Sequence, residues 1–158
     1  MSIYTAIKND HDIQRDLCAK LAKTSGDSEE RRQLWKELKK ELQVHEVAEE
    51  RHFYAPLIDT DKMQEDARHG MAEHHEIDKL IRDLSDMDMG AAQWLKTFKE
   101  LAHEVEHHLE DEEKEFFKKA KTVYSDKEAD KLAEQYKATR AEYRESWPES
   151  IPEITDED

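Results

Sequence analysis

An internal repeat is the feature of this 158-residue sequence that most constrains its fold. Shifting the chain by 63 positions superposes three polar pairs: His11 on His74, His45 on His108 and Glu49 on Glu112. The same shift superposes apolar residues: Leu17 on Leu80, Leu38 on Leu101 and Phe53 on Phe116. Because a repeated pattern of this kind indicates a repeated structural unit, we expect two halves of the chain to fold alike.

Each half contains two stretches in which apolar residues recur at helical spacing. The pattern predicts four helices, over residues 2–23, 27–57, 61–84 and 91–119. Only 3 Gly and 3 Pro occur and 41% of the residues are charged, a composition that favours helix over sheet. We therefore predict an all-α fold, namely an up-down-up-down four-helix bundle with an additional C-terminal helix.

The repeat also sets the expected domain organisation. We expect residues 1–120 to form the bundle, and residues 121–158 to form a C-terminal helix and acidic tail, packed on the bundle or extending from it. Ser125 and Glu128 have the spacing of a capping box at the start of that last helix. After Pro148 the tail is acidic and is expected to be disordered.

The acidic balance of the sequence limits its partners. A formal net charge of −15, spread along the chain, predicts repulsion from nucleic acid and from anionic membranes. Cys18 is the only cysteine, which rules out an internal disulfide and fits a reducing compartment. The N-terminus lacks a signal-peptide pattern, and no apolar run is long enough to span a bilayer. We therefore expect a soluble, cytoplasmic protein that is a monomer or a homodimer.

Helical-wheel geometry selects the same polar residues as the repeat, because each residue advances about 100° around the helix axis. Two pairs fall on the apolar faces of the second and fourth predicted helices: His45 with Glu49, and His108 with Glu112. On the third helix His74 lies at the margin of the apolar face, whereas His75 points nearly opposite. His103 and His107 lie well off the apolar face of the fourth helix.

These inward polar residues have the chemistry of metal ligands. A His-x-x-x-Glu pair places an imidazole and a carboxylate one helical turn apart, on the same side of the helix. Two such pairs, with one inward histidine from each remaining helix, converge on one volume. Burying these groups without compensation would cost several kcal/mol per charge, and bound cations remove that cost. Imidazole and carboxylate ligands on four facing helices are typical of di-iron and di-manganese sites, with zinc as a further alternative.

Four motifs resemble those of the hemerythrin-like, HHE cation-binding family: KNDHDIQRDL, HEVAEERHFYAPL, AEHHEIDKLI and HHLEDEEKEFF. The resemblance covers approximately residues 3–120. It implies a non-haem centre of two iron ions, of the Fe–O–Fe type, with manganese or zinc as other candidate metals. It also implies two bridging carboxylates and four terminal histidines, namely Glu49 and Glu112 with His11, His45, His74 and His108.

One departure from the family bears on function. The oxygen-carrying hemerythrins have a fifth histidine four positions from another on the third helix, but the positions four away from His74 are Gly70 and Asp78. This sequence therefore offers a more symmetric set of two histidines per metal, and Glu46, next to His45, could add a carboxylate to one metal as in some relatives. The predicted metal-binding residues are His11, His45, Glu46, Glu49, His74, His108 and Glu112.

The resemblance implies binding of oxygen or a related small ligand, peroxide or nitric oxide, for storage, sensing or protection. The alternative is an enzyme with the same centre that decomposes hydrogen peroxide or oxidises ferrous iron, with Glu46 or a nearby water transferring protons. A third hypothesis is a metal-free helical interaction module, in which the inward polar residues form a hydrogen-bonded network. This last hypothesis accounts least well for the repeat.

Overall fold

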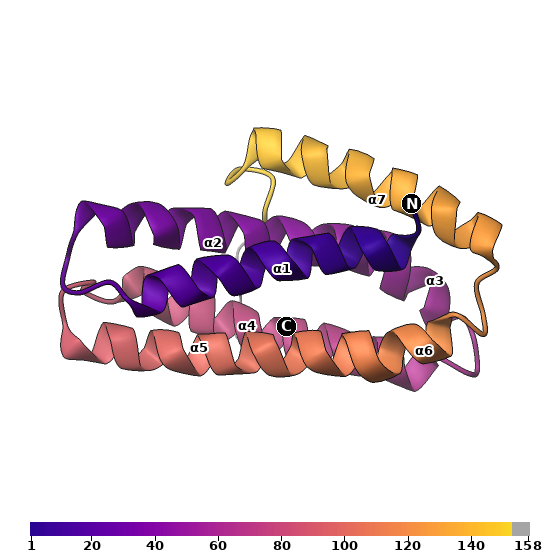
Figure 1. Cartoon of the computed structure of the whole chain (residues 1–158), viewed down its shortest axis with the longest axis horizontal. Coiled ribbons are helices and arrows are strands. Elements are labelled where there is room, and N and C mark those ends of the chain that lie inside the picture. The colour runs from indigo at the N-terminus through magenta and orange to yellow at the C-terminus, as the bar shows by residue number, and fades with distance from the viewer. Residues whose placement is uncertain (153–158) are drawn as a thin grey trace.

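The computed structural model describes residues 1–152. Four long helices run alternately up and down, and a fifth lies along the outside of the bundle (Figure 1). The helices are α1 (Ile3–Ala22), α2 (Glu29–Glu49), α4 (Gln64–Asp86), α5 (Ala92–Asp111) and α7 (Asp126–Ser146). No strand occurs in the described part of the chain. The predicted all-α bundle with an additional C-terminal helix is confirmed.

Helix starts follow the caps that the sequence offers. Ser28 caps α2, because its side chain accepts a hydrogen bond from the Arg31 N–H. Ser125 and Glu128 form the predicted capping box at the start of α7. Both caps satisfy backbone N–H groups that the first helical turn leaves without a partner.

Two π-helical segments continue α2 and α5 from the predicted bridging carboxylates onward. Segment η1 (Glu50–Tyr54) joins α2 to the short α3 (Ala55–Ile58), and segment η2 (Glu112–Phe116) joins α5 to α6 (Phe117–Ala120). Their wider turns begin at or next to the predicted bridging carboxylates, and such turns often occur at functional sites. The helices predicted over 27–57 and 91–119 are therefore continuous rods whose helical period changes near one end.

The apolar core is divided into two clusters, one toward each end of the bundle. The first contains Ile3, Ile7, Phe53, Leu57, Met63 and Phe117, and the second contains Leu21, Trp35, Leu38, Leu84, Trp94 and Phe98. On each of the four bundle helices, the predicted ligands lie between residues of the two clusters. Apolar side chains therefore separate the polar layer from water at both ends.

The C-terminal segment packs against the N-terminal half of the bundle, beside α1 and α2 (Figure 1). Trp147 Nε1 donates to Gln43 Oε1 over 2.8 Å, and the Ile151 N–H donates to Pro148 O over 3.1 Å. The expectation of disorder is therefore wrong for residues 149–152, where the chain turns back and adds contacts to α2. The rest of the predicted acidic tail lies outside the described residues.

None of the helices in residues 1–152 combines the length and the hydropathy needed to cross a bilayer.

Candidate metal centre

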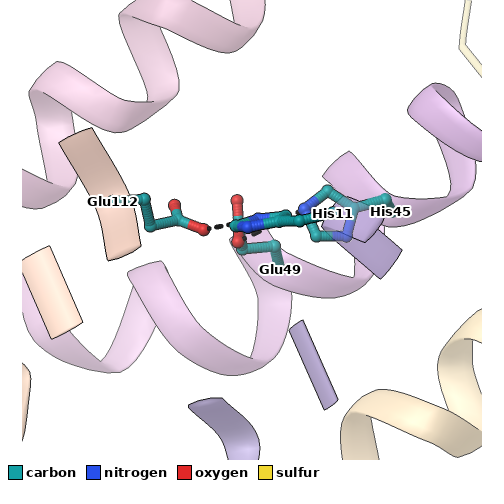
Figure 2. A group of neighbouring side chains, drawn as sticks. All are labelled: His11, His45, Glu49 and Glu112. Atoms are coloured by element: carbon teal, nitrogen blue, oxygen red, sulfur yellow. Dashed lines mark ion pairs between the residues drawn. The ribbon is translucent and has the colours of Figure 1, made fainter. Parts of the chain in front are cut away.

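Six of the seven predicted ligands meet in the middle of the bundle, where they form two groups that share Glu49. The first group is His11, His45, Glu49 and Glu112, which Figure 2 shows, and the second is Glu49, His74 and His108. Within each group, one donor atom per residue lies within 4.8 Å of the others. All six side chains are buried. Helices α1, α2 and α4 supply four of these residues, and α5 with η2 supplies the other two.

The carboxylates of Glu49 and Glu112 lie between two pairs of histidines, His11 with His45 and His74 with His108. Glu49 Oε2 is 3.3 Å from His45 Nε2, and Glu49 Oε1 is 3.0 Å from His74 Nε2. Glu112 Oε1 is 3.1 Å from His11 Nε2, and Glu112 Oε2 is 3.6 Å from His108 Nε2. Each carboxylate therefore offers one oxygen to each side of the site.

These atoms fit a metal site, because they are buried and, although they contact one another, they form no hydrogen bond of acceptable geometry. Six candidate metal-ligand atoms have no hydrogen-bond partner of acceptable geometry: Nε2 of His11, His45 and His74, both oxygens of Glu49, and Oε1 of Glu112. A buried polar atom without a partner costs about 1–3 kcal/mol, and six that converge on one volume are rare in a folded protein. First-row divalent cations with nitrogen and oxygen ligands fit this donor set.

Each of the four histidines is oriented by an outer carboxylate that contacts its other ring nitrogen, Nδ1. Each Nδ1 faces a carboxylate oxygen: His11 faces Glu113 at 2.7 Å, His45 faces Asp10 at 3.1 Å, His74 faces Glu50 at 2.9 Å, and His108 faces Glu73 at 2.9 Å. An ionised carboxylate only accepts hydrogen bonds, so each ring donates from Nδ1 and directs Nε2 to the centre. Outer carboxylates of this kind fix the ring and raise its basicity toward a metal.

The outer carboxylates follow the same 63-residue repeat as the ligands, although they are not among the residues predicted from the sequence. The 63-residue shift relates Asp10 to Glu73 and Glu50 to Glu113. The repeated unit is therefore an imidazole with its carboxylate partner, rather than the ligand alone. The sequence signal was present in the repeat and was missed because only inward-facing positions were compared.

The carboxylates hold protons on the histidines of the metal-free chain. Burial lowers the pKa of His108, but the Glu49 and Glu73 carboxylates outweigh burial and raise it to about 10. The pKa of each of the other three histidines is also raised, against burial, by neighbouring carboxylates. Burial raises the pKa of Glu113, whereas His11 and Arg15 lower it to about 2. A bound cation would take the place of these protons.

One tyrosine makes the two halves of the centre unequal. Tyr54 is buried, and its hydroxyl donates a hydrogen bond to Glu112 Oε2. Gly70 leaves room for this ring, because a Cβ there would lie 2.7 Å from Tyr54 Cζ. The residues related to Tyr54 and Gly70 by the repeat are Phe117 and Ile7, so the other half has apolar packing at this place.

Helix α7 supports the opposite half of the centre. The Tyr136 hydroxyl donates to Asp10 Oδ2, and it lies 2.6 Å from His45 Nδ1. Arg140 Nε lies 2.9 Å from Asp10 Oδ1, and Arg140 Nη2 donates to Glu41 Oε1 over 2.6 Å. The carboxylate that orients His45 is therefore fixed by a helix outside the repeated unit.

Replacing the outer carboxylate Asp10 with Asn should weaken one of the two metal positions. The substitution keeps the side-chain volume but removes the charge that favours the His45 Nδ1 proton, and loss of an outer partner costs about 10–100-fold in metal affinity. A chelator competition that resolves the two metals measures the effect. Asp16→Asn, an exposed change on the same helix, is the matched control. Equal weakening of both metals, or none, would contradict this role of Asp10.

The seventh predicted ligand, Glu46, belongs to neither group. Its side chain is buried beside Asp78 and lines a separate pocket with Gln43 and Glu50. Burial, and then the charge of Asp78, raise the pKa of Glu46 well above its ordinary value. Its role as a ligand stays a prediction that these contacts do not favour.

Comparisons with known proteins agree with this geometry. The family model described as "Hemerythrin HHE cation binding domain" matches residues 2–120. A solved structure of a hemerythrin HHE cation binding domain-containing protein from Mycobacterium kansasii superposes with a TM-score of 0.82 at 24% sequence identity. That similarity covers 92% of this chain and 89% of the other, and at this identity it establishes the fold. No curated protein matches the chain.

Proposed function

The chain belongs to the hemerythrin HHE cation-binding family, and on this premise we propose that it holds a pair of iron ions and binds dioxygen or a related small ligand. The observation that carries the proposal is the convergence, from two repeated halves, of buried Nε2 and carboxylate oxygen atoms that contact one another and have no hydrogen bond of acceptable geometry. In the proposed arrangement, His11 and His45 would hold one metal, His74 and His108 would hold the other, and the carboxylates of Glu49 and Glu112 would be available to both.

The ligand set supports iron, with manganese and zinc as the alternatives that metal analysis distinguishes. An iron pair supplies the redox chemistry needed to bind or convert dioxygen, peroxide or nitric oxide. The chain's own residues orient the ligands, exclude water through the two apolar clusters, and hold the Tyr54 proton against Glu112.

The size of the space beside the centre supports a small ligand. A cavity of about 40 Å³ is lined by Tyr54, His108 and Glu112, among other residues. One water needs at least about 10–15 Å³ of such volume, so the cavity has room for molecules of two or three heavy atoms. Dioxygen, peroxide and nitric oxide are molecules of this size.

An enzyme with the same centre is the second candidate function, and two buried groups that hold protons favour it. Burial raises the pKa of Tyr54 well above its ordinary value, with the charge of Glu112 as a further cause. Glu46 is similarly kept protonated by burial and by Asp78. Conversion of hydrogen peroxide, or oxidation of ferrous iron, requires proton transfer of the kind that such groups perform.

Anaerobic reconstitution with Fe²⁺, followed by visible spectra after adding dioxygen, hydrogen peroxide and nitric oxide in turn, tests the proposal. We expect the spectrum to change with at least one of these ligands, and steady peroxide turnover would identify the enzyme rather than the carrier. A reconstituted iron protein whose spectrum ignores all three would contradict ligand binding. A folded chain that takes up no iron would contradict the metal centre itself.

The free energy of unfolding of the metal-free chain is expected to fall as pH rises above neutrality. A histidine whose pKa is raised by folding contributes stability below its unfolded pKa of 6.5, and this contribution is lost as pH rises toward the folded value of about 10. Urea unfolding of the chelated protein at pH 6.5 and pH 9.5 measures the change. Greater stability at the higher pH would show that the carboxylates do not hold these protons.

A further inference from the structure

A second group of metal-type ligands lies on the surface between α4 and α5. It consists of two pairs spaced one helical turn apart, His69 with Glu73 and His107 with Asp111, and we call these four residues the surface cluster. Glu73 Oε2 lies 3.7 Å from His69 Nε2 and 3.8 Å from His107 Nε2. One carboxylate oxygen of Asp111 lies within 4.8 Å of the donor atoms of His69 and Glu73.

The spacing of these donors suits a small divalent cation. Metal–ligand bonds of about 2.0–2.2 Å in a tetrahedral site separate two donors by about 3.4 Å. The two distances from Glu73 Oε2 exceed this value by a few tenths of an ångström, and His107 joins the group through Glu73. The His69 and His107 side chains are 65% and 62% exposed, so they are free to move toward a cation. Two imidazoles with two carboxylates select Fe²⁺, Mn²⁺, Co²⁺ or Zn²⁺ over copper(I), which prefers sulfur ligands.

An independent observation connects the surface cluster to the buried centre. The cavity of about 40 Å³ is lined by His69, Glu73 and Asp111 from the cluster and by Tyr54, His108 and Glu112 from the centre. Glu112 is buried, and its Oε2, which accepts a hydrogen bond from Tyr54, lies 3.6 Å from His108 Nε2. Glu73 belongs to both sites, because its Oε1 accepts from His108 Nδ1 over 2.9 Å while Oε2 faces His69 and His107.

In the other half of the centre, the positions that correspond to the surface cluster are buried apolar residues. The positions related by the 63-residue shift to His69, His107 and Asp111 are Ala6, Val44 and Ala48. These three residues are buried, and Ala6 and Ala48 belong to the apolar cluster that includes Ala133 and Tyr136 of α7. The face that α7 covers in one half is therefore open in the other, and it carries metal ligands there.

We propose that the surface cluster binds one divalent first-row transition-metal ion, and that metal reaches the buried centre through it. The second part rests on the proposed function, since it requires the buried centre to take up metal. The acidic Glu115 also lines the cavity and adds to the attraction for cations, whereas Asp66, at the same cavity, is paired with Lys119 at 3.2 Å. A metal ion on this route meets a weak, exposed site first, and then the buried site whose ligands are fixed by their outer carboxylates.

Binding to the cluster is tested on the holoprotein, with the buried centre already filled with iron, by equilibrium dialysis against Co²⁺. We expect one additional Co²⁺ per chain, bound at least about tenfold more weakly in His69→Ala and His107→Ala. His103→Ala, an exposed histidine one turn away on α5, is the matched control and should bind as the unaltered chain does. Co²⁺ binding that is unchanged in both variants would overturn the surface site.

Passage of metal through the cluster is tested by the rate of anaerobic Fe²⁺ uptake into the metal-free chain. We expect His69→Ala/His107→Ala to take up iron about tenfold more slowly and to reach the same final iron content. An unchanged rate would overturn the passage while leaving Co²⁺ binding intact. Absence of iron uptake in the unaltered chain would instead contradict the proposed function, and the Co²⁺ experiment, repeated on that chain, would still decide the surface site.

Discussion

Glu49→Gln is expected to abolish binding of the metal pair. Glu49 is the residue that both ligand groups share, with one oxygen 3.3 Å from His45 Nε2 and the other 3.0 Å from His74 Nε2. The amide keeps the shape of the side chain but loses the negative charge and one of the two accepting oxygens. The loss in metal affinity should exceed the 10–100-fold that removal of an outer partner costs, so about 100-fold or more. Metal content after gel filtration measures it.

Glu110→Gln is the matched control for this experiment, because Glu110 is an exposed carboxylate on α5, two residues from both His108 and Glu112. We expect this variant to retain its metal. Circular dichroism should show that both variants are helical, so that loss of metal is separated from loss of fold. A Glu49→Gln protein that holds the full metal content would contradict the shared position of Glu49.

Removal of the metal is expected to lower the thermal stability of the chain by about 8–16 °C. A ligand that binds only the folded state at about 1,000 times its dissociation constant adds about 4 kcal/mol of stability. For a domain of this size, 1 kcal/mol shifts the melting temperature by about 2–4 °C. The physical cause is the group of buried imidazole nitrogens and carboxylate oxygens that lack hydrogen-bond partners without a cation.

Differential scanning calorimetry of the iron-loaded and chelated proteins measures this shift. In Glu49→Gln the chelator should have little effect, because that variant holds no metal pair to remove. An unaltered chain that melts at the same temperature with and without iron would show that the polar layer is satisfied by protons alone.

The bundle and its inward ligands were predictable because both are periodic. Each of the four helices carries a stripe of apolar residues, and the ligands of α2 and α5 lie on that stripe. The repeat then chose His74 over His75 and His108 over His107, and the structure buries the first of each pair. Helical period and repeat together fix which way a side chain points, which is what the formation of a buried site requires.

The outer carboxylates were not predictable from the helical period, since they lie at the edges of the helical faces, although the repeat relates Asp10 to Glu73 and Glu50 to Glu113. Glu113 lies in a run of four acidic residues, Glu110–Glu113, yet it accepts a hydrogen bond from His11 over 2.7 Å. Tyr136 reaches Asp10 only because α7 packs beside α1 and α2, and nothing in the α7 sequence specifies that position. The π-helical turns of η1 and η2 likewise depend on tertiary packing rather than on local propensity.

Iron content of the anaerobically reconstituted and desalted chain tests the central claim most directly. Two repeated sets of ligands around two shared carboxylates predict about two iron ions per chain, retained through desalting. A folded, helical protein that retains about one iron or none would contradict the paired centre.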